Sequence, residues 1–217
     1  MTAAVRMKPQ YGPTLGVLLS PRWRAASPLA RRVVIAAGVA LLVLLVGAGL
    51  TLENARYSRG GRVPFSFSYR SLYRVKPEPG EFVKMQRVRS DGELEDSLAV
   101  RPLRLPPYSG SLSGELPLYA TGYIRGLSQR YPQFELAGEG KTKVDTIFAY
   151  AVSYTTLFAG HTMWGRDILV LPERPGAREG VDIVMLTSPT ANSQVDSPAE
   201  VGSAGVLSRP LRTFSFD

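Results

Sequence analysis

The residue types that most often perform chemistry are scarce in this chain of 217 residues, which has one histidine and no cysteine. The lack of cysteine excludes disulfides, thiol nucleophiles, iron–sulfur clusters and thiolate zinc sites. His161, in AGHTMWGRD, has no second histidine as a co-ligand, and its spacing to Asp167 matches no pattern of metal ligands. We interpret His161 as a residue at a strand end or turn. The sequence predicts no catalytic, cofactor-binding or metal-binding residue.

Two glycine-rich stretches match catalytic motifs only in part. SGSLSGE, residues 109–115, is not G-x-S-x-G, because Leu112 separates its central serines. GEGKTKV contains Gly-Lys-Thr, but a phosphate loop needs a glycine at position 135, where this chain has glutamate. We interpret the first stretch as a loop that leads into a helix and residues 138–143 as a hairpin turn.

Aromatic residues are the best candidates for a binding pocket, because they combine a large contact area with a polar group. An aromatic core is the competing interpretation, and the sequence favours it. If a pocket exists, the candidate residues are Tyr119, Tyr123, Tyr150, Tyr154 and Trp164.

A run of 20 uncharged residues, from Val33 to Leu52, follows Arg31 and Arg32. A helix of about 20 apolar residues spans the roughly 30 Å hydrocarbon core of a bilayer. A cleaved signal peptide has a shorter apolar region nearer the N-terminus, so we favour an uncleaved single-pass signal-anchor. The predicted organisation is a disordered basic tail over 1–32, a transmembrane helix over 33–52, a linker over 53–62 and a folded domain over 63–217.

The net charge of +8 is unevenly distributed. Residues 1–32 hold six basic side chains and no acid, whereas residues 53–217 hold 20 basic and 18 acidic side chains. A nucleic-acid-binding domain would carry the excess on its folded part, so we expect no nucleic-acid partner. The acid-free tail beside the apolar run favours a cytoplasmic N-terminus and an extracytoplasmic C-terminal domain at the cell membrane, with bilayer lipid as a partner.

The folded domain is predicted to be α+β. Alternating apolar and polar residues predict strands in VPFSFSYRSLYRV and in EFVKMQRVRS, and a short strand is expected near Ser97–Leu103. A helix should begin near Ser113–Leu116 and end before Pro132. Its apolar stripe comprises Leu116, Ala120, Tyr123, Leu127 and Tyr131.

The second half of the domain is dominated by strands. In TIFAYAVSYTTLFAG the residues that would face each side of a sheet are largely apolar or aromatic. This predicts a strand covered on both faces. HTMWGRDILVLPE and GVDIVMLTSP are expected to pair with each other. A short helix should follow, with Ser197 as its cap, Pro198 in its first position and Pro210 at its end, before the closing strand LRTFSF. Together these elements predict a mainly antiparallel sheet packed by helices.

Several of these stretches resemble the PsbP-like superfamily, in particular its LpqN-like members. The similarity rests on FSFSYRSLY, on the strands IFAYAVSYTT and MWGRDILVLPE, and on the final helix with PLRTFSF, and it covers Val63–Asp217. The resemblance implies an α/β/α sandwich that serves as the outer domain of a single-pass membrane protein. It implies adaptor or ligand-binding roles rather than one shared reaction, so no active site is carried over. The chain departs from lipoprotein members because it has no cysteine to lipidate.

We therefore expect a membrane-anchored, extracytoplasmic, non-catalytic binding or adaptor domain with a protein partner in the cell envelope and no cofactor. A lipid- or small-ligand-binding domain and a membrane-tethered hydrolase are the alternatives. An open apolar cavity would favour the lipid-binding domain. A polar pocket in which an acid of raised pKa faces a second polar group would favour the hydrolase. A filled core with an exposed apolar patch would favour the adaptor.

Overall fold

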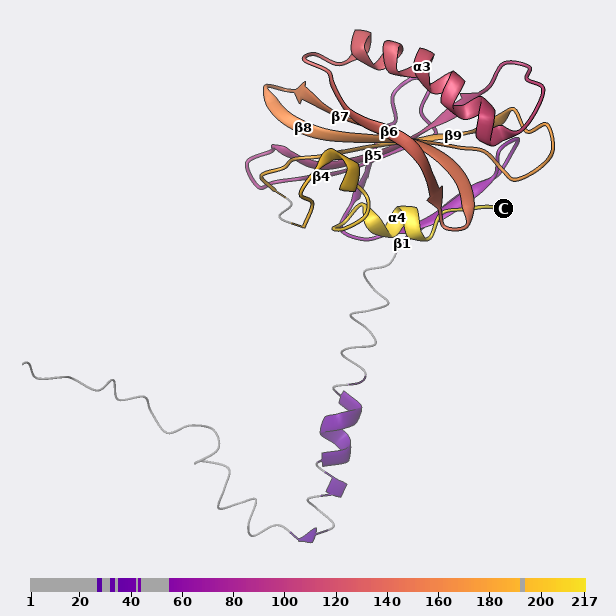
Figure 1. Ribbon diagram of the computed structural model, residues 1–217. Coiled ribbons are helices and arrows are strands. Elements are labelled where there is room, and N and C mark those ends of the chain that lie inside the picture. The colour runs from indigo at the N-terminus through magenta and orange to yellow at the C-terminus, as the bar shows by residue number, and fades with distance from the viewer. Residues whose placement is uncertain (1–26, 29–31, 34, 42, 44–54, 192–193) are drawn as a thin grey trace, which may run out of the picture. The chain divides into compact units, whose positions relative to one another are not determined.

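The computed structural model describes residues 27–28, 32–33, 35–41, 43, 55–191 and 194–217 (Figure 1). The chain divides into two units, residues 1–52 and 53–217. In the first unit residues 35–41 are helical. Most of the predicted tail and much of the predicted anchor lie outside the described residues. Among the residues that are described, no helix combines the length and the apolar character that a bilayer span requires.

The second unit is an α+β domain with two antiparallel sheets and few helices. The described elements are β1 (Ala55–Arg59), β2 (Phe65–Tyr69), β3 (Tyr73–Val75), β4 (Val83–Val88), β5 (Leu94–Arg104), α3 (Leu112–Arg130), β6 (Glu135–Val144), β7 (Ile147–Phe158), β8 (His161–Val170), β9 (Glu179–Thr187), the 3-10 helix η1 (Pro198–Glu200), α4 (Ser208–Arg212) and β10 (Ser215–Phe216).

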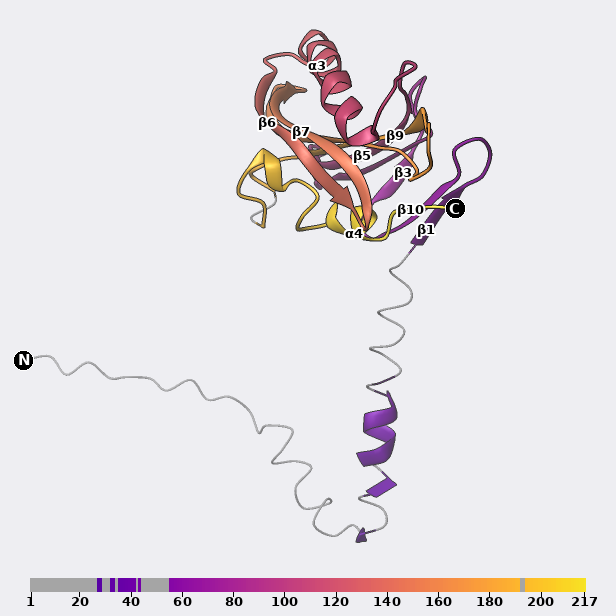
Figure 2. The ribbon, with the colours of Figure 1, turned by 45° about the vertical axis from the view of Figure 1, so that its right-hand side comes forward.

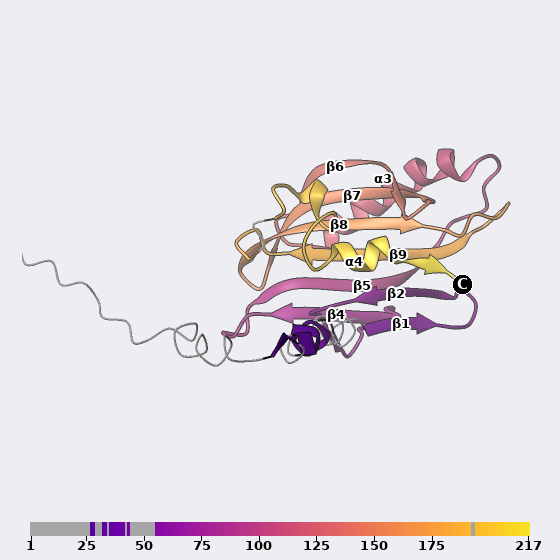
Figure 3. The ribbon, with the colours of Figure 1, turned by 90° about the horizontal axis from the view of Figure 1, so that it is seen from below.

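The larger sheet has seven strands in the order β3-β4-β5-β9-β8-β7-β6, and neighbouring strands are antiparallel. Figure 3 shows most of these strands side by side. After β5 the chain passes through α3 to β6 at the far edge, and hairpins then return it to β9, which pairs with β5. This crossover lays α3 across one face of the sheet, as Figure 2 shows.

The smaller sheet, in the order β1-β2-β10, joins the two ends of the domain. Ser215 and Phe216 of β10 pair with Ser66 and Phe65 of β2. The smaller sheet packs with α4 on the face opposite α3, where Phe65 and Phe67 join the buried side chains of the larger sheet. This second layer therefore consists of short helices and a small sheet, rather than of helices alone as in the predicted α/β/α sandwich.

The strand patterns of the second half are confirmed. Ala149–Tyr154 of β7 are all buried, which agrees with a strand covered on both faces. β8 and β9 pair over seven residues, from Trp164 opposite Thr187 to Val170 opposite Val181. The predicted helix is α3, with Leu116, Ala120 and Leu127 buried against the sheet.

Three stretches differ from the sequence prediction. Residues 55–59 form β1 instead of a linker, because Tyr57 packs against the apolar core that includes the β2 phenylalanines. The hairpin turn predicted at residues 138–143 is wrong, since β6 runs through it and turns only at Asp145, whose φ is 54°. The final helix is not continuous: Pro198 begins only the 3-10 turn η1, and Pro210 lies inside α4 instead of ending the helix. The predicted closing strand LRTFSF is correspondingly shorter, because α4 extends to Arg212 and only Ser215–Phe216 form β10.

Candidate functional site

Two aspartates are buried beneath α3, one on each of two neighbouring strands. Asp167 of β8 is 0% exposed and Asp182 of β9 is 4% exposed. The β8–β9 register pairs Asp167 with Val184 and Asp182 with Leu169, so the two carboxyl groups lie on the same face, two residues apart. Each is followed by a run of apolar residues in its strand, and a buried acid needs polar partners.

Tyrosine hydroxyls supply those partners. The Tyr123 hydroxyl, from α3, lies 2.5 Å from Asp167 Oδ2 and 2.7 Å from Asp182 Oδ2. The Tyr154 hydroxyl, from β7, donates to Asp167 Oδ1 at 3.0 Å. We call these four residues the aspartate–tyrosine cluster. It links α3 to three central strands of the sheet.

The cluster must hold an additional proton. The Tyr123 hydroxyl has one proton and cannot donate it to two carboxylates, so one carboxyl group is protonated and donates to the tyrosine. Burial, together with the negative charge of Asp167, raises the pKa of Asp182 to about 8. Burial also raises the pKa of Asp167 to about 6, partly offset by the hydrogen bonds from Tyr123 and Tyr154. Burial of both carboxyl groups therefore favours a state at neutral pH in which the pair holds one proton.

The position of Tyr154 depends on a glycine in the next strand. Tyr154 pairs with Gly165 of β8, and a Cβ atom added to Gly165 would lie 2.3 Å from the tyrosine ring. The Tyr154 ring thus lies directly over bare backbone. The rings of Tyr131 and Phe134 also pack against the Tyr154 ring, with centroids 5.5 and 5.2 Å from its centroid. Burial raises the pKa of Tyr154 well above its ordinary value, which keeps its hydroxyl a donor.

A hollow of about 450 Å³ opens beside the cluster, and we call it the α3 hollow. Asp182 and Tyr123 line it from the cluster, and Tyr119 adds an aromatic wall, with its ring centroid 6.3 Å from that of Tyr123. Its charged lining includes Glu81, Arg101 and Arg130. The sheet register explains one of these contacts, because Arg101 of β5 pairs directly with Asp182 of β9.

Two buried polar atoms at the α3 hollow have no hydrogen-bond partner among the described residues. One is Asp182 Oδ1 and the other is Arg101 Nη1. Arg101 uses its other nitrogens on Glu81 Oε1, with Nη2 at 3.0 Å and Nε at 3.3 Å. Buried polar atoms are nearly always paired in native proteins, so this unmatched donor and this unmatched acceptor, both on residues that line the hollow, call for an explanation.

The five predicted site residues are divided between the two faces of the sheet. Tyr119, Tyr123 and Tyr154 come together at the cluster and the hollow. Tyr150 belongs to the same buried layer but does not line the hollow. Trp164 packs against the core on the opposite face. Ligand binding by these residues stays a prediction.

Sequence reasoning missed the two aspartates as a pair and Arg101 altogether. A signal was present, because RDILV and VDIVM each place one aspartate in an apolar strand. No comparable signal existed for Arg101, whose role depends on the pairing of β5 with a strand about 80 residues later. His161 begins β8 and is exposed, with Nε2 3.5 Å from Glu93. The described residues contain no group of three metal-ligand side chains.

Comparisons with known proteins return similar folds but no similar sequences. No protein-family model and no curated protein match the chain. Among solved structures, PsbP (CyanoP) from Synechocystis is 16% identical, with a TM-score of 0.46, over 76% of this chain and 93% of its own. LpqN from Mycobacterium tuberculosis, described as involved in cell envelope biogenesis, is 9% identical, with a TM-score of 0.45, over 68% and 87%.

A third similar structure is PA94 from Pseudomonas aeruginosa, a protein of unknown function. It is 11% identical, with a TM-score of 0.35, over 55% of this chain and 85% of its own. At such identities and TM-scores the similarities carry no information on ligand or activity. PsbP and LpqN, whose superfamily the sequence resembles, are thus both among the similar solved structures.

Proposed function

We propose that the chain is a single-pass membrane protein whose C-terminal domain, outside the cytoplasm, binds a small hydroxyl-rich ligand at the α3 hollow. The observation that carries the proposal is the pair of unmatched buried atoms, Asp182 Oδ1 and Arg101 Nη1, at the same hollow. A hydroxyl group can accept a hydrogen bond from the guanidinium and donate one to the carboxyl oxygen. An alcohol group thus combines the acceptor that Arg101 lacks and the donor that Asp182 lacks.

The charges around the hollow are offset by nearby groups, which favours an uncharged ligand. Arg130 lies in the field of the aspartate–tyrosine cluster. Arg101 is paired with Glu81, and Glu78 at the same hollow is paired with Lys84. Burial raises the pKa of Asp182, which favours its neutral form. A sugar or other polyol meets these conditions, with several hydroxyl groups and an apolar ring face to lie against Tyr119.

The test is calorimetric titration of the full chain in a non-ionic detergent with glucose, N-acetylglucosamine and inositol. We expect saturable binding of at least one of them. Asp182→Leu and Tyr119→Ala should each weaken it about tenfold or more, as loss of a buried hydrogen bond or a stacking surface does. The control is Tyr73→Ala, which removes a tyrosine that is 70% exposed on β3 and should change nothing. Absence of saturable binding, or equal weakening by the control, would overturn the proposal.

The anchor and the envelope partner belong to the same proposal. They are supported by the uncharged run 33–52 and the acid-free tail before it. Cross-linking of the full chain in intact membranes, followed by mass spectrometry, tests the adaptor role. One protein recovered in near-stoichiometric amount supports it. Recovery of lipid or small molecules alone contradicts it and favours the ligand-binding role by itself.

A membrane-tethered hydrolase is the second candidate, and one observation favours it. Asp182 is an acid with a raised pKa that faces the α3 hollow beside Arg101, the arrangement a general acid requires. Asp182→Asn separates the two functions, because the amide preserves shape and hydrogen bonding but cannot deliver a proton. A binding site keeps most of its affinity for the sugar in this variant. If the domain is a hydrolase, the Asp182→Asn variant still binds the substrate but forms no product.

A further inference from the structure

Strand β6 forms one edge of the larger sheet, because β7 is its only partner among the described strands. Figure 3 shows it as the outermost strand on its side of the sheet. It is ten residues long, whereas β3 at the opposite edge has only three. In the described part of the chain, no backbone hydrogen bond joins the outer side of β6 to another segment. A long edge strand with unpaired amide and carbonyl groups is a template on which another strand can pair.

The exposed side chains of β6 carry charges of both signs on one face. Glu139, Lys141 and Lys143 are exposed and alternate with less exposed residues. Glu139 lies opposite Val152 of β7 and Lys141 opposite Tyr150, and these two partners belong to the core beneath α3. Directly paired residues share a face of the sheet, so Glu139 and Lys141 both point to the α3 side of this edge.

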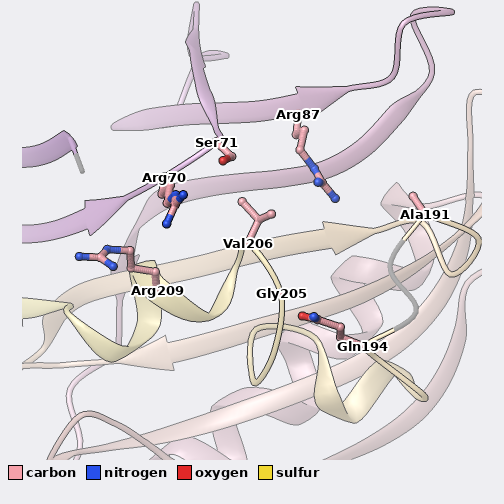
Figure 4. A pocket seen from close by; sticks show the side chains of 8 residues that line it. All are labelled: Arg70, Ser71, Arg87, Ala191, Gln194, Gly205, Val206 and Arg209. Carbon is pink, nitrogen blue, oxygen red and sulfur yellow. The ribbon is translucent and has the colours of Figure 1, made fainter. Parts of the chain in front are cut away.

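Neither Glu139 nor Lys141 has an ion-pair partner within the part of the chain that the structure describes. Basic residues on the side of α4 are placed differently. In the hollow of about 660 Å³ that Figure 4 shows, Arg87 Nη2 lies 2.7 Å from Asp96 Oδ2, and the Arg209 guanidinium points away from Arg87. The two charges of β6 are thus more available to a partner outside the domain.

The charge pattern of β6 is self-complementary. If two copies of the strand pair antiparallel about Gly140, Glu139 of each copy lies opposite Lys141 of the other. Moving one copy by two residues puts Glu139 opposite Glu139, or Lys141 opposite Lys141 if it moves the other way. Opposite charges on directly paired residues stabilise antiparallel strands, and like charges destabilise them. The pattern therefore favours one register over its two neighbours.

The backbone around Gly140 is suited to such pairing. The register shift of β6 against β7 lies between Leu136 and Gly138, so residues 138–144 pair with β7 without interruption. A Cβ atom added to Gly138 or Gly140 would meet only open space. Lysine on an edge strand normally deters pairing with other strands. Glu139, two residues before Lys141 on the same face, removes this obstacle for a second copy of the same strand.

We propose that two copies of this chain associate through β6, antiparallel and centred on Gly140, so that their two seven-stranded sheets become continuous. The interface is separate from the α3 hollow, whose lining includes no residue of β6. The inference therefore does not depend on the proposed function. Sugar binding and dimer formation are measured separately, and either can fail without the other.

The absence of cysteine makes the register directly measurable. In a dimer of Gly140→Cys the two cysteines are opposite each other, about 5 Å apart between Cα atoms, which a disulfide can bridge. Gly138→Cys is the matched control, with the same substitution and the same open space. Its two cysteines would lie about 14 Å apart, four residues at roughly 3.4 Å each.

The first experiment is mild oxidation of both cysteine variants, as the full chain in a non-ionic detergent, followed by non-reducing electrophoresis. We expect a covalent dimer from Gly140→Cys and little or none from Gly138→Cys. Equal cross-linking of the two variants would indicate random collision and overturn the proposal. Absence of a covalent dimer from both would overturn it as well.

Charge reversal tests the complementarity without cysteines. Glu139→Lys and Lys141→Glu should each weaken the dimer about tenfold or more, because each creates two like-charge pairs in every dimer. A mixture of the two variants restores both opposite-charge pairs, so a dimer with one copy of each should form. Light scattering after size exclusion, which separates the protein mass from the detergent mass, measures the state of each sample.

Asp196→Lys is the control for charge reversal, because it makes the same change of charge as Glu139→Lys at an exposed site outside β6. It should leave the dimer intact. Any association through residues 1–52 is the same in all variants. A parent chain that stays monomeric throughout the micromolar range would overturn the proposal, as would a mixture of the two reversed variants that forms no dimer.

Discussion

The two faces of the larger sheet carry two aromatic groups that differ mainly in their hydroxyls. On one face Phe65, Phe67 and Phe214 stack, with centroids 5.5 to 6.4 Å apart. These rings contain no polar atom and need no partner. On the other face Tyr123 and Tyr154 bury similar rings, but their hydroxyls meet two carboxyl groups. Hydrophobic burial stabilises both faces, and of these two groups of rings only the tyrosines donate hydrogen bonds to carboxyl groups.

The difference explains why the α3 face is the better candidate for function. A phenylalanine layer is complete once it is packed, because dispersion and hydrophobic burial have no direction. The tyrosine layer adds directional bonds, a proton and two unmatched atoms. Substitutions can therefore test the comparison in three ways. They can change the packing of the phenylalanines, the contact of the Tyr154 ring with the backbone of Gly165, or the proton held by the two aspartates.

The largest effect should come from Phe65→Ala on the apolar face. Phe65 is 0% exposed and stacks with Phe67 and Phe214, so truncation leaves a cavity in a mainly aromatic layer. We expect a loss of about 3–5 kcal/mol in the free energy of unfolding, measured by urea denaturation. The loss should be independent of pH. A loss below about 1 kcal/mol would mean that this layer is not a packed core.

A smaller effect is expected from Gly165→Ala on the tyrosine face. The new methyl group would strike the Tyr154 ring, which forces the ring off Asp167 and should cost about 1–3 kcal/mol. Gly140→Ala is the matched control, a strand glycine with open space around it, and should leave stability unchanged or slightly raised. Equal effects of the two alanines would show that the Tyr154 ring does not rest on Gly165.

The subtlest effect is the pH dependence of Asp182→Asn. Because the folded pKa of Asp182 is raised to about 8 from an ordinary value of 3.8, the folded state keeps a proton that the unfolded chain has lost between these values. The free energy of unfolding therefore falls as pH rises from about 4 to 8. Asp182→Asn should flatten this fall, most clearly between pH 6 and 8. The control is Asp196→Asn, at an exposed site, whose free energy of unfolding should vary with pH as in the parent chain. If Asp182→Asn also follows the parent pH dependence, the cluster holds no additional proton.

The sequence predicted which segments form helices and strands more fully than it predicted which strands pair with one another. β7, β8, β9 and α3 follow from alternation and from one apolar stripe, which are local patterns. Pro210 misled the prediction of the last helix because it is the third residue of α4, where the helix leaves amide groups unpaired in any case. Strand β1 was overlooked because the basic composition of ARYSR concealed its alternation.

The candidate site was only partly accessible from the sequence. Trp164 was placed with the tyrosines, but it neighbours Gly165, the residue opposite Tyr154, and adjacent strand residues point to opposite faces. A difference of one residue therefore moves a side chain across the sheet. The meeting of Arg101 with Asp182 depends on a pairing between distant strands, which composition and periodicity do not encode.

The pairing of β10 with β2 has a consequence for the order of assembly. The Ser66 hydroxyl lies 3.2 Å from that of Ser215 and 3.0 Å from a carboxylate oxygen of Asp217, the last residue of the chain. Contacts between such distant parts of a sequence form slowly and late in folding. During synthesis β2 must wait for residues 215–216 before it can pair with β10, and β5 must wait for β9. Neither sheet can therefore be completed while only the first half of the domain has been made.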